Sequence, residues 1–309
     1  MGKGKGYGKT ILFGEHFVVY GLPAIVSAIA DYTLAKIEKT NSNEWELKDE
    51  RDSTPGYKKE KLEHQKNSIN RIIKASGLKT NTGMKIWLGG NLYCASGVGA
   101  SAASCTAIAR ALNEEFALGF DDAKINELAF EGEKAYHGTP SGLDNTASTY
   151  GGLLWFKKNE TKKNTMNKMT LKKPIEIIIA NTGLVANTLK AVEGVKKRKK
   201  TSPEKYDKIF SEYNKLVKEA KNALNQMNLE KIGKLMNKNH KLLQKIGVSL
   251  KENDELVKIA LDNGALGAKL TGGGLGGLVL ILTPGKKLQQ KIANAIEKKG
   301  FKVNKTTIG

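Results

Sequence analysis

The strongest constraint on the fold is a glycine-rich segment, Lys269–Gly277, that lies between two apolar segments. Five of the six residues from Gly272 to Gly277 are glycine. Ordering so many glycines is costly in conformational entropy, and a plain hairpin turn does not need them. The sequence therefore favours two strands, 265–270 and 278–282, joined by a loop whose backbone approaches a ligand closely. A purely structural loop is the alternative.

The periodicity of apolar residues predicts strands and helices in two groups. In the first group we expect strands at 10–13, 17–20, 25–29, 32–37, 85–88 and 153–156, and helices at 65–75, 101–116 and 121–136. In the second group we expect a strand at 175–180 and helices at 203–224, 229–246 and 253–263. The two glycine-linked strands, a helix at 286–299 and a strand at 301–307 follow. Residues 40–62 are polar and are expected to be a loop. The length suggests two domains or one large one, and the change in pattern places a boundary near residue 170, in the polar segment 157–173. This boundary divides the chain into 1–170 and 171–309.

The formal charge of +20 raises the possibility of nucleic-acid binding. Only four of the 51 basic residues are arginine, however, and the other 47 are lysine. Arginine provides the bidentate contacts that phosphate and base recognition favours, and no aromatic residues accompany the basic run 196–200. We therefore interpret the charge as a solvated surface that can steer small anions, and we expect no nucleic-acid partner.

The cysteines and the apolar segments bear on the compartment. The chain has only two cysteines, Cys94 and Cys105, which cannot form a disulfide scaffold and indicate a reducing environment. No apolar segment approaches the length needed to span a bilayer, and the amino-terminal residues lack the apolar core of a signal peptide. We therefore expect a cytoplasmic protein with no membrane partner.

The amino terminus contains a glycine-rich segment that does not meet the requirements of a nucleotide-binding motif. Residues 4–10 superficially resemble a nucleotide-binding P-loop, but the motif requires glycine where Lys3 stands. A P-loop also lies between a strand and a helix, whereas an extended segment follows here. We therefore exclude a P-loop nucleoside triphosphatase.

A better phosphate-binding candidate is the small-residue segment 97–103, which precedes a helix. Its residues are Gly97, Val98, Gly99, Ala100, Ser101, Ala102 and Ala103. Free N–H groups and the positive dipole end of a helix suit a phosphate, and a serine there can reach a bound Mg²⁺. Close helix–strand packing is the alternative. A Rossmann fingerprint is disfavoured, because the acidic residues about 20 positions on, Asp121 and Asp122, stand at a helix start.

Two carboxylates occur across a predicted turn, Glu133 at the end of a helix and Asp144 in the polar segment after it. Such a pair can divide the work, one holding a metal and the other contacting a substrate hydroxyl. The alternative is that Asp144 merely supports a turn with Pro140 and Gly142. We interpret His137 as an ordinary residue at a helix carboxyl end.

The segment 9–21, KTILFGEHFVVYG, places Lys9, Glu15 and His16 around a strand and its turn. Together with HGTPSGLDN at 137–145 and the two glycine-rich segments, it resembles the superfamily of galactokinase, homoserine kinase, mevalonate kinase and phosphomevalonate kinase. The order and spacing of the motifs are similar over nearly the whole chain. Within this superfamily the sequence VVYG at 18–21 is similar to that of the mevalonate kinases.

The resemblance implies a reaction and a set of site residues. The reaction would be ATP-dependent phosphorylation of the C5 hydroxyl of mevalonate, with Mg²⁺. Residues 97–103 would surround the ATP phosphates, and Ser101 and Glu133 would bind Mg²⁺. Asp144 would face the C5 hydroxyl with Lys9 beside it. The substrate would be contacted by Glu15, His16, Thr188 and the glycine-rich loop at Gly272 and Gly273.

The resemblance also implies an α+β fold in two parts, an amino-terminal domain like the second domain of ribosomal protein S5 and a ferredoxin-like carboxyl-terminal domain. A homodimer is possible by the same analogy. The chain departs from the family pattern at Tyr93, Val98 and Ala100 in the first loop, at Leu275 in the second, and at Ala186 near Thr188. These departures bear on kinetics and regulation more than on the reaction type.

Two other functions remain open from the sequence. One is phosphorylation of another small alcohol or phosphate by a kinase of the same superfamily. The other is a weakly active nucleotide-binding paralogue with a regulatory role. Retention of Lys9, Ser101, Glu133 and Asp144 argues against the paralogue, because a module without catalysis has no physical need for the whole set.

Overall fold

The computed structural model describes residues 1–53, 56–94, 97–159, 164–184 and 186–309. Within these residues the chain forms two compact units. The first unit contains Met1–Lys9 and Ala28–Gly151, and the second contains Thr10–Ser27 and Gly152–Gly309. Two long strands, β1 (Gly2–Phe13) and β2 (Ala24–Lys39), therefore contribute residues to both units. The domain boundary near residue 170 is a separate, sequence-based division, and it stays a prediction.

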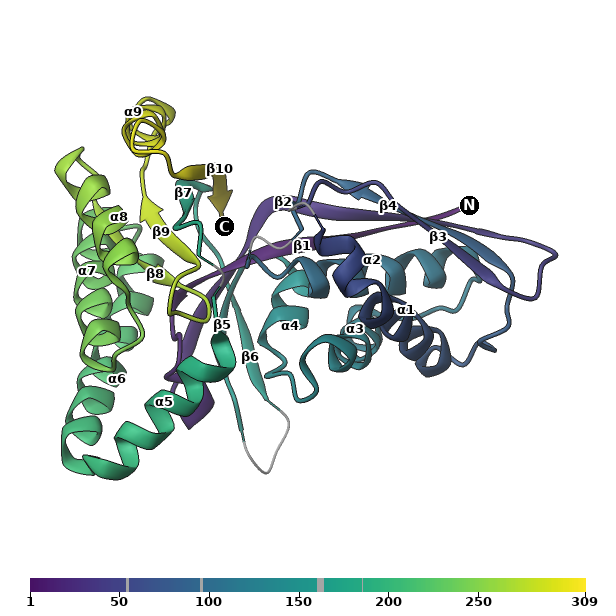
Figure 1. The fold of residues 1–309 in the computed structure, drawn as a ribbon, viewed down its shortest axis with the longest axis horizontal. Helices are drawn as coiled ribbons and strands as arrows, with labels where there is room; N and C mark the ends of the chain where they lie inside the picture. Colours follow the sequence, from purple (N-terminus) through teal and green to yellow (C-terminus); the bar gives the residue numbers. More distant parts are fainter. Residues whose placement is uncertain (54–55, 95–96, 160–163, 185) are drawn as a thin grey trace. The chain divides into compact units, whose positions relative to one another are not determined.

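The first unit has a sheet with helices packed on it (Figure 1). Its strand β4 (Met84–Gly90) pairs antiparallel with residues 33–39 of β2 and parallel with β3 (Trp45–Asp49). The helices are α1 (Tyr57–Ala75), α2 (Ala100–Glu115), α3 (Asp122–His137) and α4 (Leu143–Tyr150). Buried aliphatic residues of α1, α2, α3, β2 and β4 form one hydrophobic core.

The glycines near the amino terminus have a structural role in this unit. Gly2, Gly4 and Gly6 alternate along β1, and their backbone lies directly against α2. A Cβ at Gly4 would come within 2.2 Å of the carbonyl oxygen of Ala107, and one at Gly6 within 2.1 Å of that of Ala103. These glycines therefore permit a close strand–helix approach. Their position inside a strand agrees with the exclusion of a P-loop.

The second unit is built on an antiparallel sheet in the order β10-β7-β9-β8. These strands are β7 (Ile175–Asn181), β8 (Gly267–Thr271), β9 (Leu278–Leu282) and β10 (Lys302–Ile308). With a helical crossover between β7 and β8, and with α9 (Lys286–Glu297) between β9 and β10, the arrangement is the ferredoxin-like β-α-β-β-α-β motif. The sequence-based prediction of two α+β parts is thus confirmed.

The crossover contains the remaining helices, α5 (Thr188–Thr201), α6 (Pro203–Asn225), α7 (Leu229–Lys245) and α8 (Lys251–Asp262). Helices α7 and α8 pack on β8, and α6 packs on α7 (Figure 1). A second pairing joins residues 24–27 of β2 to β5 (Leu153–Lys157), which pairs with β6 (Thr165–Met169). A short 3₁₀ helix, Val18–Tyr20, lies between β1 and β2. In the described part of the chain, no helix is long and apolar enough to cross a membrane.

Several elements differ from the sequence-based expectations. The segment 40–62 was expected to be a loop, but it contains β3 and the start of α1, and the polar segment 157–173 contains β6. These elements are half exposed, so their side chains give no clear apolar period. Residues 17–20 were expected to be a strand and are largely the 3₁₀ helix. Helices α4 and α5 were not predicted, because α4 is short and α5 has only two buried residues, Ala191 and Val195.

Candidate active site

The phosphate-binding candidate, residues 97–103, leads into α2 of the first unit. Gly97 and Gly99 both have a φ of 74°, a left-handed conformation that glycine adopts without steric cost. Gly99 is the residue before the helix, and it has no side chain that could cap the first turn of α2. The N–H groups of that turn suit an anion, and the dipole of this 16-residue helix favours negative charge there.

Lys9 is tied to this segment by its backbone and by its side chain. Its amide nitrogen donates a hydrogen bond of 2.8 Å to the carbonyl oxygen of Val98. Its aliphatic stem lies against Gly99, where a Cβ would come within 2.9 Å of Lys9 Cγ. Gly99 thus makes room for the side chain of Lys9.

The ammonium group of Lys9 reaches Asp144 on the first turn of α4. Nζ lies 3.3 Å from Oδ1 of Asp144, and the lysine side chain is 7% exposed while that of the aspartate is 31% exposed. Asp144 was expected in a polar loop, and its position on a helix is a correction to that expectation. One carboxylate oxygen is thus held by a buried cation, while the side chain remains accessible to a ligand.

Glu133 is the second of the two carboxylates that the sequence predicted for the site, and it is almost completely buried on α3. Burial and the nearby charge of Asp144 raise its pKa to about 8, although a hydrogen bond with Ser101 and the charge of Lys9 act in the opposite direction. Nε2 of His137 lies 3.8 Å from Oε2 of Glu133. The four residues Lys9, Ser101, Glu133 and Asp144 therefore belong to one electrostatic group.

This group fits a magnesium ion that is shared with a nucleotide. A serine hydroxyl and a carboxylate are hard oxygen ligands, and a buried carboxylate with a raised pKa gains most from a bound cation. The described residues contain no cluster of three or more His, Cys, Asp or Glu side chains that could hold a metal. In kinases, magnesium is usually held by one or two protein side chains together with substrate phosphates.

The second unit brings together Glu15 and Lys269, a pair that sequence reasoning missed. Both side chains are 0% exposed and form an ion pair. Burial raises the pKa of Glu15, and the Lys269 ammonium acts against this rise. Lys269 stands at the start of the glycine-rich segment, and no sequence pattern distinguished it from the many other lysines of the chain.

His16 follows Glu15 in a left-handed conformation, with a φ of 63°. Its Nε2 donates a hydrogen bond of 2.9 Å to the carbonyl oxygen of Gly273. Burial lowers its pKa to about 4, so the ring is neutral at neutral pH. Its Nδ1 is buried without a hydrogen-bond partner among the described residues, as is Oε2 of Glu15. Two adjacent residues therefore each offer a buried acceptor to a ligand.

The glycine-rich loop between β8 and β9 also packs against Thr188, the first residue of α5. A Cβ at Gly273 would lie 2.0 Å from Oγ1 of Thr188, whereas one at Gly272 would meet nothing within 4 Å. Leu275 has a φ of 54°, and its amide donates to the carbonyl oxygen of Val248. The structure thus assembles Glu15, His16, Thr188 and the loop in the second unit, as it assembles Lys9, Ser101, Glu133 and Asp144 in the first.

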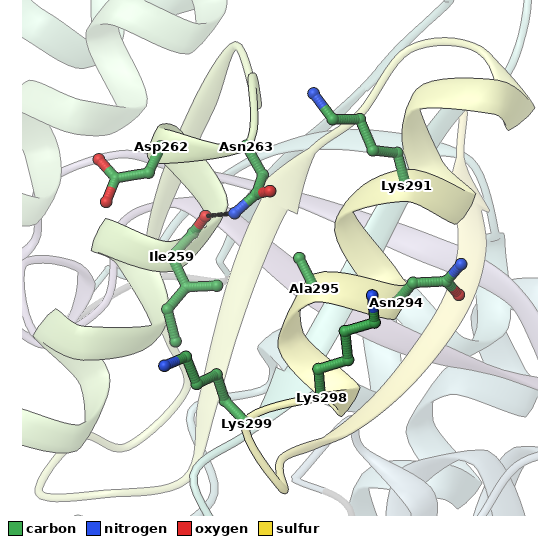
Figure 2. Close-up of a pocket in the computed structure, with 8 residues that line it drawn as sticks. All are labelled: Ile259, Asp262, Asn263, Lys291, Asn294, Ala295, Lys298 and Lys299. Carbon is green, nitrogen blue, oxygen red and sulfur yellow. Dashed lines mark hydrogen bonds between the residues drawn. The ribbon is translucent and has the colours of Figure 1, made fainter.

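A separate surface groove of about 530 Å³ lies between α8 and α9 (Figure 2). Its lining residues include Lys291, Lys298 and Lys299, and a hydrogen bond of 2.8 Å joins Asn263 to the carbonyl oxygen of Ile259. None of the site residues expected from the sequence lines it. Its lysines are three of the 47 that make the chain strongly basic.

Comparisons with known proteins agree with this geometry. The model of the GHMP kinases N terminal domain matches residues 64–152, and that of the GHMP kinases C terminal domain matches residues 217–302. The chain is 33% identical to a mevalonate kinase of Pyrococcus abyssi, over 94% of this chain and 90% of the relative. It is 29% identical to a mevalonate kinase of Arabidopsis thaliana, over 99% and 97% of the two chains.

Solved structures give the same result. A crystal structure of L. major mevalonate kinase in complex with R-mevalonate superimposes with a TM-score of 0.94 and 36% identity, over 100% of this chain and 96% of that chain. The Methanococcus jannaschii mevalonate kinase follows with a TM-score of 0.82 and 27% identity, over 99% and 98% of the two chains. A galactokinase of Lactococcus lactis, at 21% identity, shares the fold.

Proposed function

Because the chain belongs to the GHMP kinase family, we propose that it transfers the γ-phosphoryl group of ATP to the C5 hydroxyl of mevalonate, giving 5-phosphomevalonate and ADP. The observation that carries this proposal is the pairing of Lys9 with Asp144 at 3.3 Å, in the same unit as the start of α2 behind Gly99. Phosphoryl transfer requires positioning and charge neutralisation more than covalent chemistry, and this group of residues supplies both.

In the proposed complex the loop 97–103 and the first turn of α2 hold the ATP phosphates through backbone N–H groups. The Ser101 hydroxyl and the Glu133 carboxylate would hold Mg²⁺. When bound there, the ion would supply positive charge that offsets the charge of the phosphates. The raised pKa of Glu133 supports this assignment, because a bound cation stabilises the ionised carboxylate.

Asp144 is proposed to orient the C5 hydroxyl and to accept its proton, and Lys9 to stabilise the negative charge that develops on the transferred phosphoryl group. The ion pair keeps the Asp144 carboxylate in one orientation. An accessible carboxylate with a fixed partner is suited to hold a hydroxyl in line with the γ-phosphorus.

In the second unit Glu15, His16, Thr188, Gly272 and Gly273 are proposed to contact mevalonate. The free buried acceptors of Glu15 and His16 support this role, because a polar ligand would satisfy them. The close packing of Gly273 on Thr188 would fix the loop against the start of α5.

A coupled assay of ADP release with several acceptors tests the function. Mevalonate, phosphomevalonate, galactose and homoserine are compared at equal concentration, with the Asp144→Asn variant as the control for background hydrolysis. Release with mevalonate alone supports the proposal. Release with another acceptor alone supports a different kinase activity of the family, and ATP binding without release on any acceptor supports the nucleotide-binding paralogue.

A cytoplasmic location, a homodimer and the division into domains 1–170 and 171–309 belong to the same proposal. The two free, buried cysteines, Cys94 and Cys105, are compatible with a reducing compartment. Native mass spectrometry tests the dimer, and expression of residues 171–309 alone tests whether the second domain folds independently.

A further inference from the structure

The buried ion pair of the second unit suggests a role for Lys269 that the proposed reaction does not yet assign. Lys269 lies on β8, and its Nζ contacts Oε1 of Glu15, the carbonyl oxygen of Leu270 at 2.6 Å and that of Ile11 at 3.4 Å. An ammonium group has three hydrogens to donate, so each of them has an acceptor. The lysine is therefore held in one position, and it is inaccessible to solvent.

The carboxylate of Glu15 is only half satisfied by this arrangement. Lys269 contacts Oε1, whereas Oε2 is buried and has no hydrogen-bond partner among the described residues. A buried acceptor without a partner costs free energy. The orientation set by Lys269 thus leaves one oxygen available for a donor that arrives with a ligand.

Stability alone does not explain the buried ion pair of Glu15 and Lys269. Replacing a buried ion pair by apolar residues of similar volume is often neutral or stabilising, whereas removing one partner is strongly destabilising. The groups facing the pair are Thr271 on β8, Tyr213 on α6 and His240 on α7. His240 is itself buried and hydrogen-bonded to Asp254 at 2.9 Å. Among the described residues, the cation that contacts the Glu15 carboxylate is Lys269.

We propose that Lys269 is a positioning residue for the acceptor substrate: it fixes Oε1 of Glu15 so that Oε2 accepts a hydrogen bond from a substrate hydroxyl. This inference rests on the proposed function, because it takes Glu15 as a substrate contact. The side chain of Lys269 is fully buried and contacts Glu15, so it acts on the substrate through that residue.

The test is a double-mutant cycle with Lys269→Met, Glu15→Gln and the double variant. Lys258→Met, which removes an exposed lysine paired with Asp262 in the same unit, is the control. For each variant kcat, the KM for mevalonate, the KM for ATP and the pH profile of kcat/KM are measured, with melting temperature as the check on folding.

Lys269→Met is expected to raise the KM for mevalonate about tenfold or more, with little change in the KM for ATP. The acidic limb of the pH profile is expected to move to higher pH, because the carboxylate loses the charge that favours its ionised form. In the Glu15→Gln background the same substitution is expected to have little further effect. A lower melting temperature with an unchanged KM for mevalonate and an unchanged acidic limb overturns the inference.

Lys269→Met can fail to fold, because it leaves a buried carboxylate without its partner. In that case the double variant is compared with Glu15→Gln alone. Equal KM values for mevalonate support the inference, and a further rise of about tenfold overturns it. If the wild-type enzyme phosphorylates another acceptor of the panel in place of mevalonate, the proposed function is wrong. The same double-mutant cycle, measured with that acceptor, then tests the role of Lys269.

Discussion

Gly99 and Lys9 lie so close together that a side chain at Gly99 would displace Lys9. A Cβ there would come within 2.9 Å of Cγ and 3.2 Å of Cε of Lys9. The glycine therefore leaves the space through which the lysine side chain reaches Asp144.

Substitution Gly99→Ala is expected to lower kcat about tenfold or more, because the added methyl group displaces Lys9. Gly119→Ala is the matched control, since Gly119 has a φ of 70° and open space where its Cβ would be. Both substitutions should cost about 1 kcal/mol of stability from the left-handed backbone. Steady-state kinetics and urea unfolding check this, and an equal kcat in the two variants would contradict the assignment of Lys9.

Removal of either member of the Lys9–Asp144 pair is expected to abolish most turnover. Asp144→Asn and Lys9→Met should each lower kcat by about 10²- to 10⁴-fold, because the first loses the proton acceptor and the second a stabilising charge. Asp122→Asn, which removes the carboxylate that pairs with Arg110 on the same unit, should leave kcat unchanged. Near-normal turnover of a folded Asp144→Asn protein would make the proposed site wrong.

Glu133 should make the stability of the ligand-free protein depend on pH. Its pKa in the folded state is raised from an ordinary 4.5 to about 8, so between these values the folded state holds a proton that the unfolded state releases. The contribution of Glu133 to the free energy of unfolding is therefore fully present below pH 4.5 and is lost as the pH rises to about 8.

The substitution Glu133→Gln should therefore make the protein more stable than the wild type above pH 8, with the difference shrinking toward pH 4.5. Urea unfolding at several pH values measures this difference. Glu131→Gln, on the same helix but half exposed and paired with Arg71 and Lys134, should show no such trend. The Glu133→Gln variant should also need more Mg²⁺ for half-maximal activity, because an amide is a weaker ligand than a carboxylate.

The glycine-rich loop depends on a close contact between Gly273 and Thr188. Gly273→Ala is expected to raise the KM for mevalonate, because its Cβ would lie 2.0 Å from Oγ1 of Thr188 and force the loop or the threonine to move. Gly300→Ala is the control in the same unit, because it meets no neighbour within 4 Å and has a φ of 85°, so it should mainly lower stability by about 1 kcal/mol. Equal KM values for mevalonate in the two variants would show that Thr188 does not support the loop.

Much of the site could be predicted from the chain because its motifs are short and local. The segments 9–21, 97–103, 133–145 and 269–277 each carry glycines or charged residues at spacings that a simple fold does not need. They predicted the participation of Lys9, Glu133 and Asp144, which the structure places in one electrostatic group. The long apolar helices and the central strands could be predicted for the same reason, since their periodicity is itself local.

Other features were not predictable from local pattern. The helix α4 that carries Asp144 is short and follows a glycine with a φ of 82°, so the sequence there indicated a turn. The lysine-rich start of α1 and the half-exposed strands β3 and β6 show no apolar period, because one side of each element remains in water.

The sequence alone determined the family, the motifs and the types of residue in the site, since these depend on neighbours along the chain. Only the tertiary structure distinguished Lys269 from the other lysines, because its role comes from a contact with Glu15 across 254 positions. Only the tertiary structure likewise showed that Gly2, Gly4 and Gly6 allow the strand to pack closely on the helix α2. The roles of such residues depend on burial and on contacts between distant parts of the chain, and the spacing of residues within a motif predicts neither.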